Sequence, residues 1–277
     1  MALCNMKALL AEAASRQKAV GAFNVGSMEM VIGVIKAAED LNCPVIMQIA
    51  EKRLSHSPLD LMGPMMVNAA KQSNVNIAVH FDHGTSLEKI KKALDYGFTS
   101  VMFDGSLYPI QENIRRTQEV LKLAKNYGAS VEGEIGVVGG NEGGSENHSV
   151  HYTLPEDALF FAEQTNLDAL AIAIGNAHGN YAVAPKLRFD IVEATSTLVN
   201  VPLVLHGGTG LTEEDFKKAI HLGIRKVNIA TACYDALTLQ AQNYFSQCSK
   251  PDYFGLNESM IEGFYNKVKQ HIHVFND

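Results

Sequence analysis

The chain has 277 residues, of which 47% are hydrophobic and 19% charged, the composition of a globular protein with a sizeable buried core. Its formal net charge of −7, without any dense run of Lys and Arg, argues against nucleic acid as a partner but leaves an anionic substrate open. No stretch approaches the ~20 apolar residues needed to span a bilayer, so no membrane insertion is expected.

The N-terminal segment, residues 1–17, is predicted to form an amphipathic helix rather than a signal peptide, because Lys7 and Glu12 interrupt its apolar run. The four cysteines form no CxxC pair and show no spacing that suggests a disulfide framework. Reduced thiols are therefore the expected state. Together these features predict a cytoplasmic protein.

Eight short runs rich in Val, Ile, Leu and Ala are predicted to be strands. Most of them are continuously apolar rather than alternating, as expected when both faces of a parallel sheet are buried. The predicted strands are residues 20–25, 44–50, 76–82, 99–104, 130–136, 168–174, 201–206 and 225–230.

Helical patterns separate these runs. Residues 86–97, 113–128 and 212–223 each end in Gly, a helix-stop signal, shortly before the next strand. The alternation predicts an α/β fold, a (β/α)₈ or TIM barrel, rather than an open doubly wound sheet. No linker or composition break marks a second domain, so we expect residues 1–277 to form a single domain with a C-terminal helical segment near 256–274.

The longest interval between predicted strands separates the fifth from the sixth. The excess falls in residues 137–152, which contain four glycines and no helical period. Long loops without secondary structure are usually functional or disordered. At the rim where barrel enzymes hold their chemistry, this loop is predicted to be a lid that closes over substrate. A surface loop without a role is the alternative.

Three histidines, His83, His178 and His206, each follow a separate apolar run. A parallel barrel gathers the carboxyl ends of its strands at one rim, which would bring these distant residues together. Three neutral imidazoles and one open position describe a catalytic zinc site, so we predict one Zn²⁺ per subunit. Three unrelated strand-end histidines are the alternative.

Asp82 precedes His83 directly, and successive side chains of a regular strand point to opposite faces. Both can serve one site only if the strand has ended by His83, a bend that Gly84 permits. A carboxylate beside a metal in a partly dry pocket is a natural general acid or base. The alternative is that Asp82 only orients a metal-binding histidine.

Asp104 and Glu134 end the adjacent fourth and fifth strands. They could orient the metal ligands, form a second metal position, or cap the chain locally. Glu132 shares a strand face with Glu134. Because buried carboxylates without a cation are costly, we expect a metal or a basic partner nearby.

Two glycine- or threonine-bearing segments end strands seven and eight, HGGTG at 206–210 and NIAT at 228–231. Barrels often bind phosphate with the loops after these strands, because glycines let backbone N–H groups approach an anion. Tight turns are the alternative. Lys226 lies at the start of strand eight and is expected at the opposite rim, which argues against catalysis by an amine.

Seven motifs, taken together and in their order along the chain, resemble those of the class II, metal-dependent ketose-bisphosphate aldolases, the group of fructose- and tagatose-bisphosphate aldolases. The resemblance runs from Ala22 to Thr231 and is carried by AFN, HFDHG, MFDGS, VEGEIGVVGG, AIGNAHG, PLVLHGGTG and KVNIAT. It implies reversible cleavage of a phosphorylated ketose to dihydroxyacetone phosphate and an aldehyde, by a homodimer or homotetramer.

The resemblance also implies residue roles. Asp82 would move the proton of the hydroxyl whose C–C bond breaks, and Glu142 in the lid would exchange a proton on the enediolate carbon. Asp104 and Glu134 match positions of a second or displaced metal. The zinc ligands would be His83, His178 and His206.

For the substrate, the resemblance implies a contact with Asn24 and a cradle for the phosphate nearest the ketone. Gly179 matches a residue that also helps to form a monovalent-cation site for Na⁺ or K⁺. The cradle residues would be Gly179, Gly207, Gly208, Thr209, Asn228 and Thr231.

Three departures from the family pattern affect the far end of the substrate. Residues 249–260 contain no arginine, which many members use for the second phosphate. Residues 50–58 lack the usual Gly-rich turn but offer Arg53 and His56 as far-end contacts. Ala230 stands where fructose-type enzymes often have Asp or Asn, and an alanine at this position resembles the tagatose-type branch of the family. The substrate is therefore expected to be a ketose 1-phosphate or a 1,6-bisphosphate such as that of tagatose or fructose.

Two other functions compete with aldol cleavage. A zinc hydrolase on the same barrel commonly has an HxH pair on strand one, whereas strand one here ends AFN. A non-catalytic family member would have no need to retain the three histidines, Asp82 and Glu142.

Overall fold

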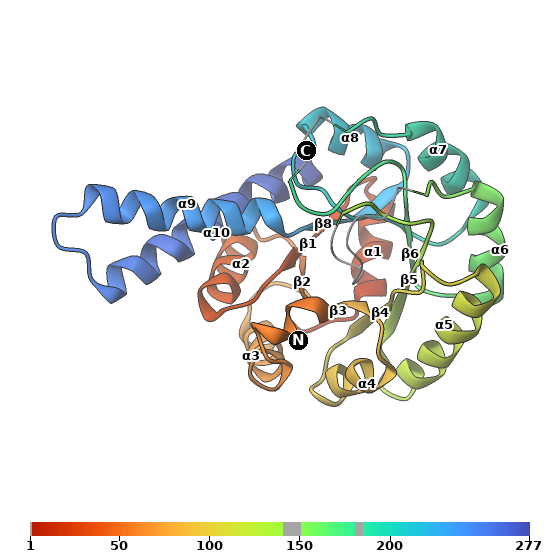
Figure 1. The fold of residues 1–277 in the computed structure, drawn as a ribbon, viewed down its shortest axis with the longest axis horizontal. Coiled ribbons are helices and arrows are strands. Elements are labelled where there is room, and N and C mark those ends of the chain that lie inside the picture. Colours follow the sequence, from red (N-terminus) through yellow and green to blue (C-terminus); the bar gives the residue numbers. More distant parts are fainter. Residues whose placement is uncertain (1, 141–150, 181–184) are drawn as a thin grey trace.

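The structure, a computed structural model, describes residues 2–140, 151–180 and 185–277 as a closed parallel barrel surrounded by helices (Figure 1). Within these ranges, the strands pair in chain order and the first closes on the eighth. The predicted TIM barrel and single domain are confirmed, and every predicted strand lies within two residues of its expected limits. The strands are β1 (Val20–Asn24), β2 (Val45–Ala50), β3 (Ile77–Gly84), β4 (Ser100–Phe103), β5 (Ser130–Ile135), β6 (Ala169–Ile172), β7 (Leu203–Leu205) and β8 (Ile224–Ile229).

Helices follow the strands where the sequence patterns predict them. The predicted stops Gly97, Gly128 and Gly223 have positive φ angles of 94°, 65° and 126°, the conformation that ends a helix. None of the helices in the described ranges is long and apolar enough to cross a membrane. The helices are α1 (Met6–Ser15), α2 (Met28–Asp40), η1 (Glu51–Ser55), α3 (Leu59–Gln72), α4 (Leu87–Asp95), α5 (Ile110–Lys125), α6 (Pro155–Thr165), α7 (Phe189–Leu198), α8 (Glu213–His221), α9 (Thr231–Gln247) and α10 (Tyr253–Asn276).

The interior of the barrel near the amino ends of the strands is filled by apolar side chains. Strand register pairs Ala22 with Ile46 and Ile46 with Ala78, and these side chains form one buried cluster with Met6 and Leu10 of α1. The predicted N-terminal helix thus covers the amino ends of the strands (Figure 1). Access to the interior is therefore expected from the opposite, carboxyl-terminal rim.

Two residues further along the same strands, the interior becomes polar. Asn24 pairs with Gln48, Gln48 with His80, and His80 with Ser100, and all four side chains are buried. Because strand side chains alternate, this layer faces inward like the apolar layer beneath it. It forms the floor on which the candidate site stands.

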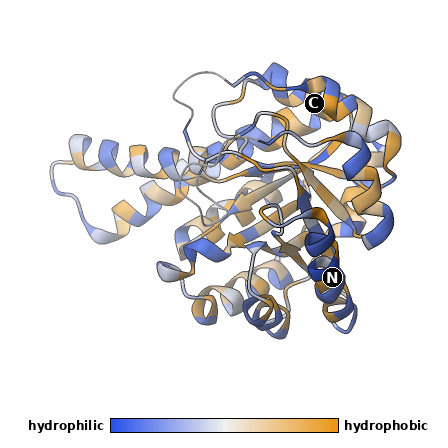
Figure 2. Ribbon diagram, turned by 45° about the vertical axis from the view of Figure 1, so that its right-hand side comes forward, coloured by the Kyte–Doolittle hydropathy of each residue, from blue (hydrophilic) through white to orange (hydrophobic). Residues whose placement is uncertain are grey.

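Helices α9 and α10 form an arm that projects away from the barrel (Figure 1). The arm carries hydrophobic as well as hydrophilic residues along its length (Figure 2). Its exposed side chains include Leu239, Phe245 and Phe254. The second half of α10, where Phe264 and Phe275 are buried, packs back against α2 and the barrel.

Candidate active site

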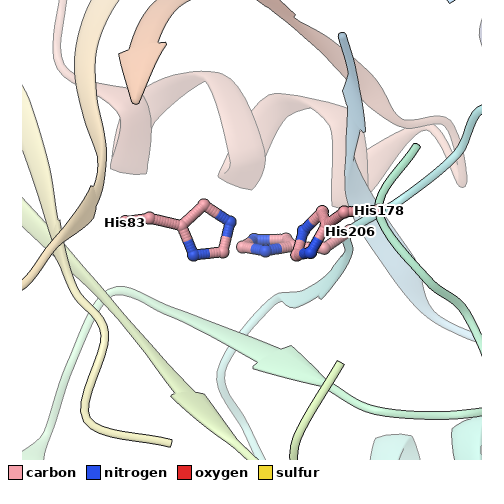
Figure 3. A group of neighbouring side chains, drawn as sticks. All are labelled: His83, His178 and His206. Atoms are coloured by element: carbon pink, nitrogen blue, oxygen red, sulfur yellow. The ribbon is translucent and has the colours of Figure 1, made fainter. Parts of the chain in front are cut away.

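The three predicted histidines converge at the carboxyl-terminal rim (Figure 3). His83 lies on β3, His178 follows β6 and His206 follows β7. The His83 ring centroid is 4.9 Å from that of His178 and 4.7 Å from that of His206, and the last two are 5.8 Å apart. One nitrogen from each ring lies within 4.8 Å of the others. The three side chains therefore share one site.

The backbone at His83 explains how two consecutive residues face that site. The expectation that the strand ends by His83 is wrong, because β3 continues to Gly84. Its register against β4 shifts between Phe81 and Gly84, and His83 has a φ of 47°. This β-bulge turns the His83 side chain to the side of Asp82. A side chain at Gly84 would collide with the carbonyl oxygen of Met102, 2.6 Å from an added Cβ.

Carboxylates hold two of the imidazoles from behind. Nδ1 of His83 lies 2.8 Å from an Asp104 oxygen, and Nε2 of His206 lies 2.8 Å from a Glu132 oxygen. One nitrogen of each ring also belongs to the group of three histidines that could hold a metal ion. Such carboxylate–imidazole pairs fix the tautomer and orientation of zinc-binding histidines. The donor set of three imidazoles therefore fits Zn²⁺.

Burial keeps two of these imidazoles neutral. It lowers the pKa of His178 well below its usual value, and the charge of His83 lowers it further. Burial likewise lowers the pKa of His206. It acts in the same direction on His83, but the carboxylates of Asp82 and Asp104 outweigh it and raise this pKa well above its usual value. Two of the three candidate ligands are thus neutral, and the carboxylates around His83 supply negative charge that favours a cation at this place.

Asp82 is fully buried beside the histidines and bound by three amides. Its Oδ2 accepts hydrogen bonds from Asn24 at 3.0 Å and Gln48 at 3.2 Å, and its Oδ1 accepts one from Asn228 at 3.2 Å. Burial raises the pKa of Asp82, but the charges of His83 and other cationic groups outweigh burial and leave it below its usual value. The lowered pKa means that Asp82 is an ionised carboxylate. Because Asp104 is the hydrogen-bond partner of His83 Nδ1, Asp82 is not needed to orient that ring and is a candidate general acid or base.

Asp104 and Glu134 lie on the other side of His83. One oxygen of each and a His83 nitrogen lie within 4.8 Å of one another. Glu134 also approaches Nδ1 of His206 at 3.3 Å. Burial and the charge of Asp104 raise the pKa of Glu134 well above its usual value. A second cation position could therefore form here without new ligands.

The predicted phosphate residues line one small cavity together with His178. At its edge, Thr209 Oγ1 accepts a hydrogen bond from the backbone N–H of Ala232 at 3.1 Å. α9 begins here, at Thr231, and Ala230 provides no side-chain cap. A glycine-rich loop facing a helix N-terminus is a suitable anion site. The cavity is lined by Asn24, His178, Gly179, Gly207, Gly208, Thr209, Asn228, Ala230 and Thr231.

The other predicted residues lie at the rim or beyond the described ranges. Arg53 belongs to η1, after β2, and its guanidinium lies 5.6 Å from the ring centre of Tyr234 in the first turn of α9. His56 follows η1 and is exposed. Glu142 falls within residues 141–150, outside the described residues.

The two ends of the predicted lid are close together and close to the histidines. Val137 and His151 form an antiparallel bridge, with N–H···O distances of 2.8 and 3.2 Å. The carbonyl of Gly139 accepts a hydrogen bond from the backbone N–H of His178 at 2.8 Å. The loop between them is thus attached directly beside a candidate metal ligand.

Several site residues were not found from the sequence. Gln48, His80 and Lys226 are fully buried in the barrel. The placement of Lys226 at the opposite rim is wrong for its side chain, because its ammonium lies 2.8 Å from a Glu132 oxygen. Burial and the Lys226 charge lower the pKa of His80 to about 3. The available signal was alternation, since Lys226 and His80 are each two residues from an inward-facing polar residue, Asn228 or Asp82.

Comparison with known proteins gives a family. Residues 4–277 match the family model described as class II fructose-bisphosphate aldolase. The chain is 40% identical to a 6-phospho-5-dehydro-2-deoxy-D-gluconate aldolase of Bacillus velezensis, over 89% of this chain and 86% of the relative. It is 37% identical to a sulfofructosephosphate aldolase of Alkalicoccus urumqiensis, over 99% and 97% of the two chains.

A solved structure extends this likeness to three dimensions. The crystal structure of the YdjI aldolase from Escherichia coli K12 superimposes with a TM-score of 0.88 and 33% identity, covering 99% of this chain and 97% of that one. Both the sequence and the barrel that positions the three histidines agree with one family. The chain therefore belongs to the class II fructose-bisphosphate aldolase family and is a carbon–carbon lyase.

Proposed function

We propose that the protein is a zinc-dependent aldolase that reversibly cleaves a phosphorylated ketose to dihydroxyacetone phosphate and an aldehyde. The substrate is a ketose 1-phosphate or a ketose 1,6-bisphosphate such as that of tagatose or fructose. The observation that carries this proposal is the convergence of three imidazoles beside the buried carboxylate of Asp82 and a cavity suited to phosphate.

We assign the metal to His83, His178 and His206, whose nitrogens lie close enough to bind one ion. When bound, Zn²⁺ supplies a Lewis acid that polarises the ketone and hydroxyl oxygens of the substrate. Asp104 and Glu132 orient two of these imidazoles. Asp104 and Glu134, together with His83, offer a second or displaced position for the ion.

The proton steps are assigned to two carboxylates. Asp82 accepts the proton of the hydroxyl at the carbon that becomes the aldehyde, while the adjacent C–C bond breaks, and it returns this proton in condensation. The amides of Asn24, Gln48 and Asn228 hold the carboxylate in position by hydrogen bonds, and none of these three partners carries a charge. Glu142, in the lid, delivers a proton to the enediolate carbon. Closure of the lid excludes water from this step.

The phosphate nearest the ketone is assigned to the cavity beside His178. Backbone N–H groups at glycines and at the start of α9 provide donors without bulky side chains. Gly179 is the proposed participant in a Na⁺ or K⁺ site. Binding energy from this end of the substrate supports cleavage at a remote bond. The contacts are assigned to Asn24, Gly179, Gly207, Gly208, Thr209, Asn228 and Thr231.

Substitution of Thr209 by Val is expected to raise KM about tenfold, equivalent to about 1.4 kcal/mol, with a smaller effect on kcat. The change removes the hydroxyl that accepts the Ala232 N–H and lines the cavity, but it keeps the shape of the side chain. Steady-state kinetics measure the effect. Thr238→Val, which alters an exposed residue of α9, is the matched control. An unchanged KM for Thr209→Val contradicts the assigned phosphate position.

The far end of the substrate is assigned to Arg53 or His56, which lie after β2 at the rim. The names of the two relatives describe substrates with one phosphate and another acidic group, a gluconate carboxylate or a sulfonate. An arginine at this rim suits such a group, because its guanidinium binds carboxylates and sulfonates through two parallel hydrogen bonds.

We also propose a homodimer or homotetramer in the cytoplasm. The projecting arm exposes the apolar side chains of Leu239, Phe245, Tyr253 and Phe254, which a second copy of the chain would cover. The cysteines are all free thiols, as expected in a reducing compartment. Sedimentation of the purified protein as a monomer at micromolar concentration would contradict the proposed assembly.

The proposed function is tested by a screen of ketose 1-phosphates and 1,6-bisphosphates, including the fructose, tagatose and sorbose epimers. We expect release of dihydroxyacetone phosphate in a coupled assay, loss of this activity after exhaustive chelation, and recovery with Zn²⁺. Release of inorganic phosphate or ester hydrolysis without dihydroxyacetone phosphate would instead support a hydrolase. Full activity after chelation, with no metal in the protein, would contradict the proposal.

A further inference from the structure

Lys226 is a lysine whose ammonium is buried inside the barrel, beneath the candidate site. It belongs to β8, and none of its side chain is exposed. Nζ lies 2.8 Å from Oε2 of Glu132 and donates a hydrogen bond to Oδ1 of Asn228 at 2.7 Å. A single ammonium therefore contacts two residues, of which Asn228 is bonded to Asp82 and Glu132 to His206.

The contact with Asn228 decides which way that amide points. An ammonium has only donors, so Asn228 must turn its oxygen toward Lys226. Its NH₂ group then points at Oδ1 of Asp82, to which it donates at 3.2 Å. If the amide were reversed, its oxygen would face the carboxylate of Asp82. Lys226 thus selects the amide orientation that supports Asp82.

The contact with Glu132 balances a buried negative charge. The other oxygen of this carboxylate, Oε1, lies 2.8 Å from Nε2 of His206. His80 is farther from Glu132, with Nε2 at 3.7 Å from Oε2, and its Nδ1 is bonded to Ser100 at 2.9 Å. A buried carboxylate without a close cation is costly. Lys226 therefore keeps Glu132 in place behind His206.

We propose that Lys226 is a positioning residue for the aldol reaction: through Asn228 it fixes the general acid/base Asp82, and through Glu132 it fixes the ring of His206 that faces the metal. The inference rests on the proposed function for its catalytic part. Lys226 is neither among the residues that line the proposed phosphate cavity nor among those that could hold the metal.

The first test is Lys226→Met, which keeps the length of the side chain but removes the ammonium. We expect kcat at saturating Zn²⁺ to fall by about 10–100-fold and the Zn²⁺ affinity, measured by competition with a chelator, to fall by a similar factor, the usual effects of losing a supporting residue. Lys217→Met, which removes an exposed lysine paired with Glu213, is the control. Unchanged kcat and unchanged Zn²⁺ affinity overturn the inference.

A double-mutant cycle separates positioning from a general loss of structure. In an Asp82→Ala background at saturating Zn²⁺, Lys226→Met is expected to reduce the residual rate by a smaller factor than in the wild type, because one of the two groups that Lys226 positions is already absent and only the effect through Glu132 and His206 remains. A general structural defect would reduce the rate by the same factor in both backgrounds, and that outcome overturns the assigned role.

A charge-balanced variant covers the case in which Lys226→Met does not fold. Lys226→Met with Glu132→Gln removes both charges and keeps an acceptor for His206, so it is expected to fold and bind Zn²⁺ but to remain slow. A wild-type kcat in this variant would show that Lys226 only balances the charge of Glu132, and it would overturn the positioning role. Absence of aldol cleavage in the wild type refutes the proposed function instead, and the Zn²⁺ titration still decides the Glu132 contact.

Discussion

The variant His178→Ala is expected to lose its metal and its aldolase activity together. His178 supplies one of three ring nitrogens that lie within 4.8 Å of one another, and two imidazoles are one protein ligand short of a catalytic zinc site. The loss of Zn²⁺ affinity should exceed the ~10–100-fold typical of removing a residue that only supports a ligand. Metal analysis of the purified variant and the rate of dihydroxyacetone phosphate release measure both effects.

The position of His178 makes this experiment informative about the lid as well. Its backbone N–H donates to the carbonyl of Gly139, and this bond remains available to alanine. The substitution therefore removes the ring without removing the attachment of the loop. His273→Ala, at an exposed position of α10, is the control. A His178→Ala protein with a full complement of zinc and a wild-type rate would show that the assigned ligand set is wrong.

Asp82→Ala is expected to retain zinc and to lose cleavage by about 10²–10⁴-fold, the usual contribution of a general acid or base. The carboxylate accepts hydrogen bonds from the amides of Asn24, Gln48 and Asn228. His83 and His206 are oriented instead by Asp104 and Glu132. The loss should appear in kcat, because in the proposed mechanism Asp82 acts on the reacting hydroxyl. Metal content, thermal stability and steady-state kinetics are the measurements.

Asp104→Ala provides the matched carboxylate. Asp104 is the hydrogen-bond partner of His83, so its loss should weaken Zn²⁺ binding by about 10–100-fold. Excess Zn²⁺ should then restore much of the activity of Asp104→Ala but none of the activity of Asp82→Ala. A near-wild-type rate for Asp82→Ala, or its rescue by added Zn²⁺, would assign Asp82 the supporting role instead.

The repeating βα pattern made most of the fold predictable from sequence. Buried parallel strands are continuously apolar, and helices that end in Gly97, Gly128 and Gly223 mark the return to the next strand. In a barrel the end of every such strand reaches the same rim, so polar residues at these ends are candidates for one site. For this reason the convergence of the three histidines, and the grouping of the loops after strands seven and eight at one rim, were predictable from the sequence.

The direction of individual side chains was not predictable in the same way. Alternation along an ideal strand would separate Asp82 from His83, yet a β-bulge with a φ of 47° at His83 brings them together. The sequence signal for this bulge is weak, because a positive φ is uncommon at a histidine. Gly84, where an added Cβ would lie 2.6 Å from the carbonyl oxygen of Met102, only permits the close approach of β3 to β4.

The sequence by itself determined the barrel, the rim and the residue types of the site, because these depend on apolar periodicity and on the order of βα units. Only the tertiary structure decided which groups touch inside the barrel. Lys226 is far in sequence from Glu132 and from Asp82, and closure of β8 onto β1 brings all three into one interior. In that interior, water is excluded, and each buried charge needs a partner from a distant strand.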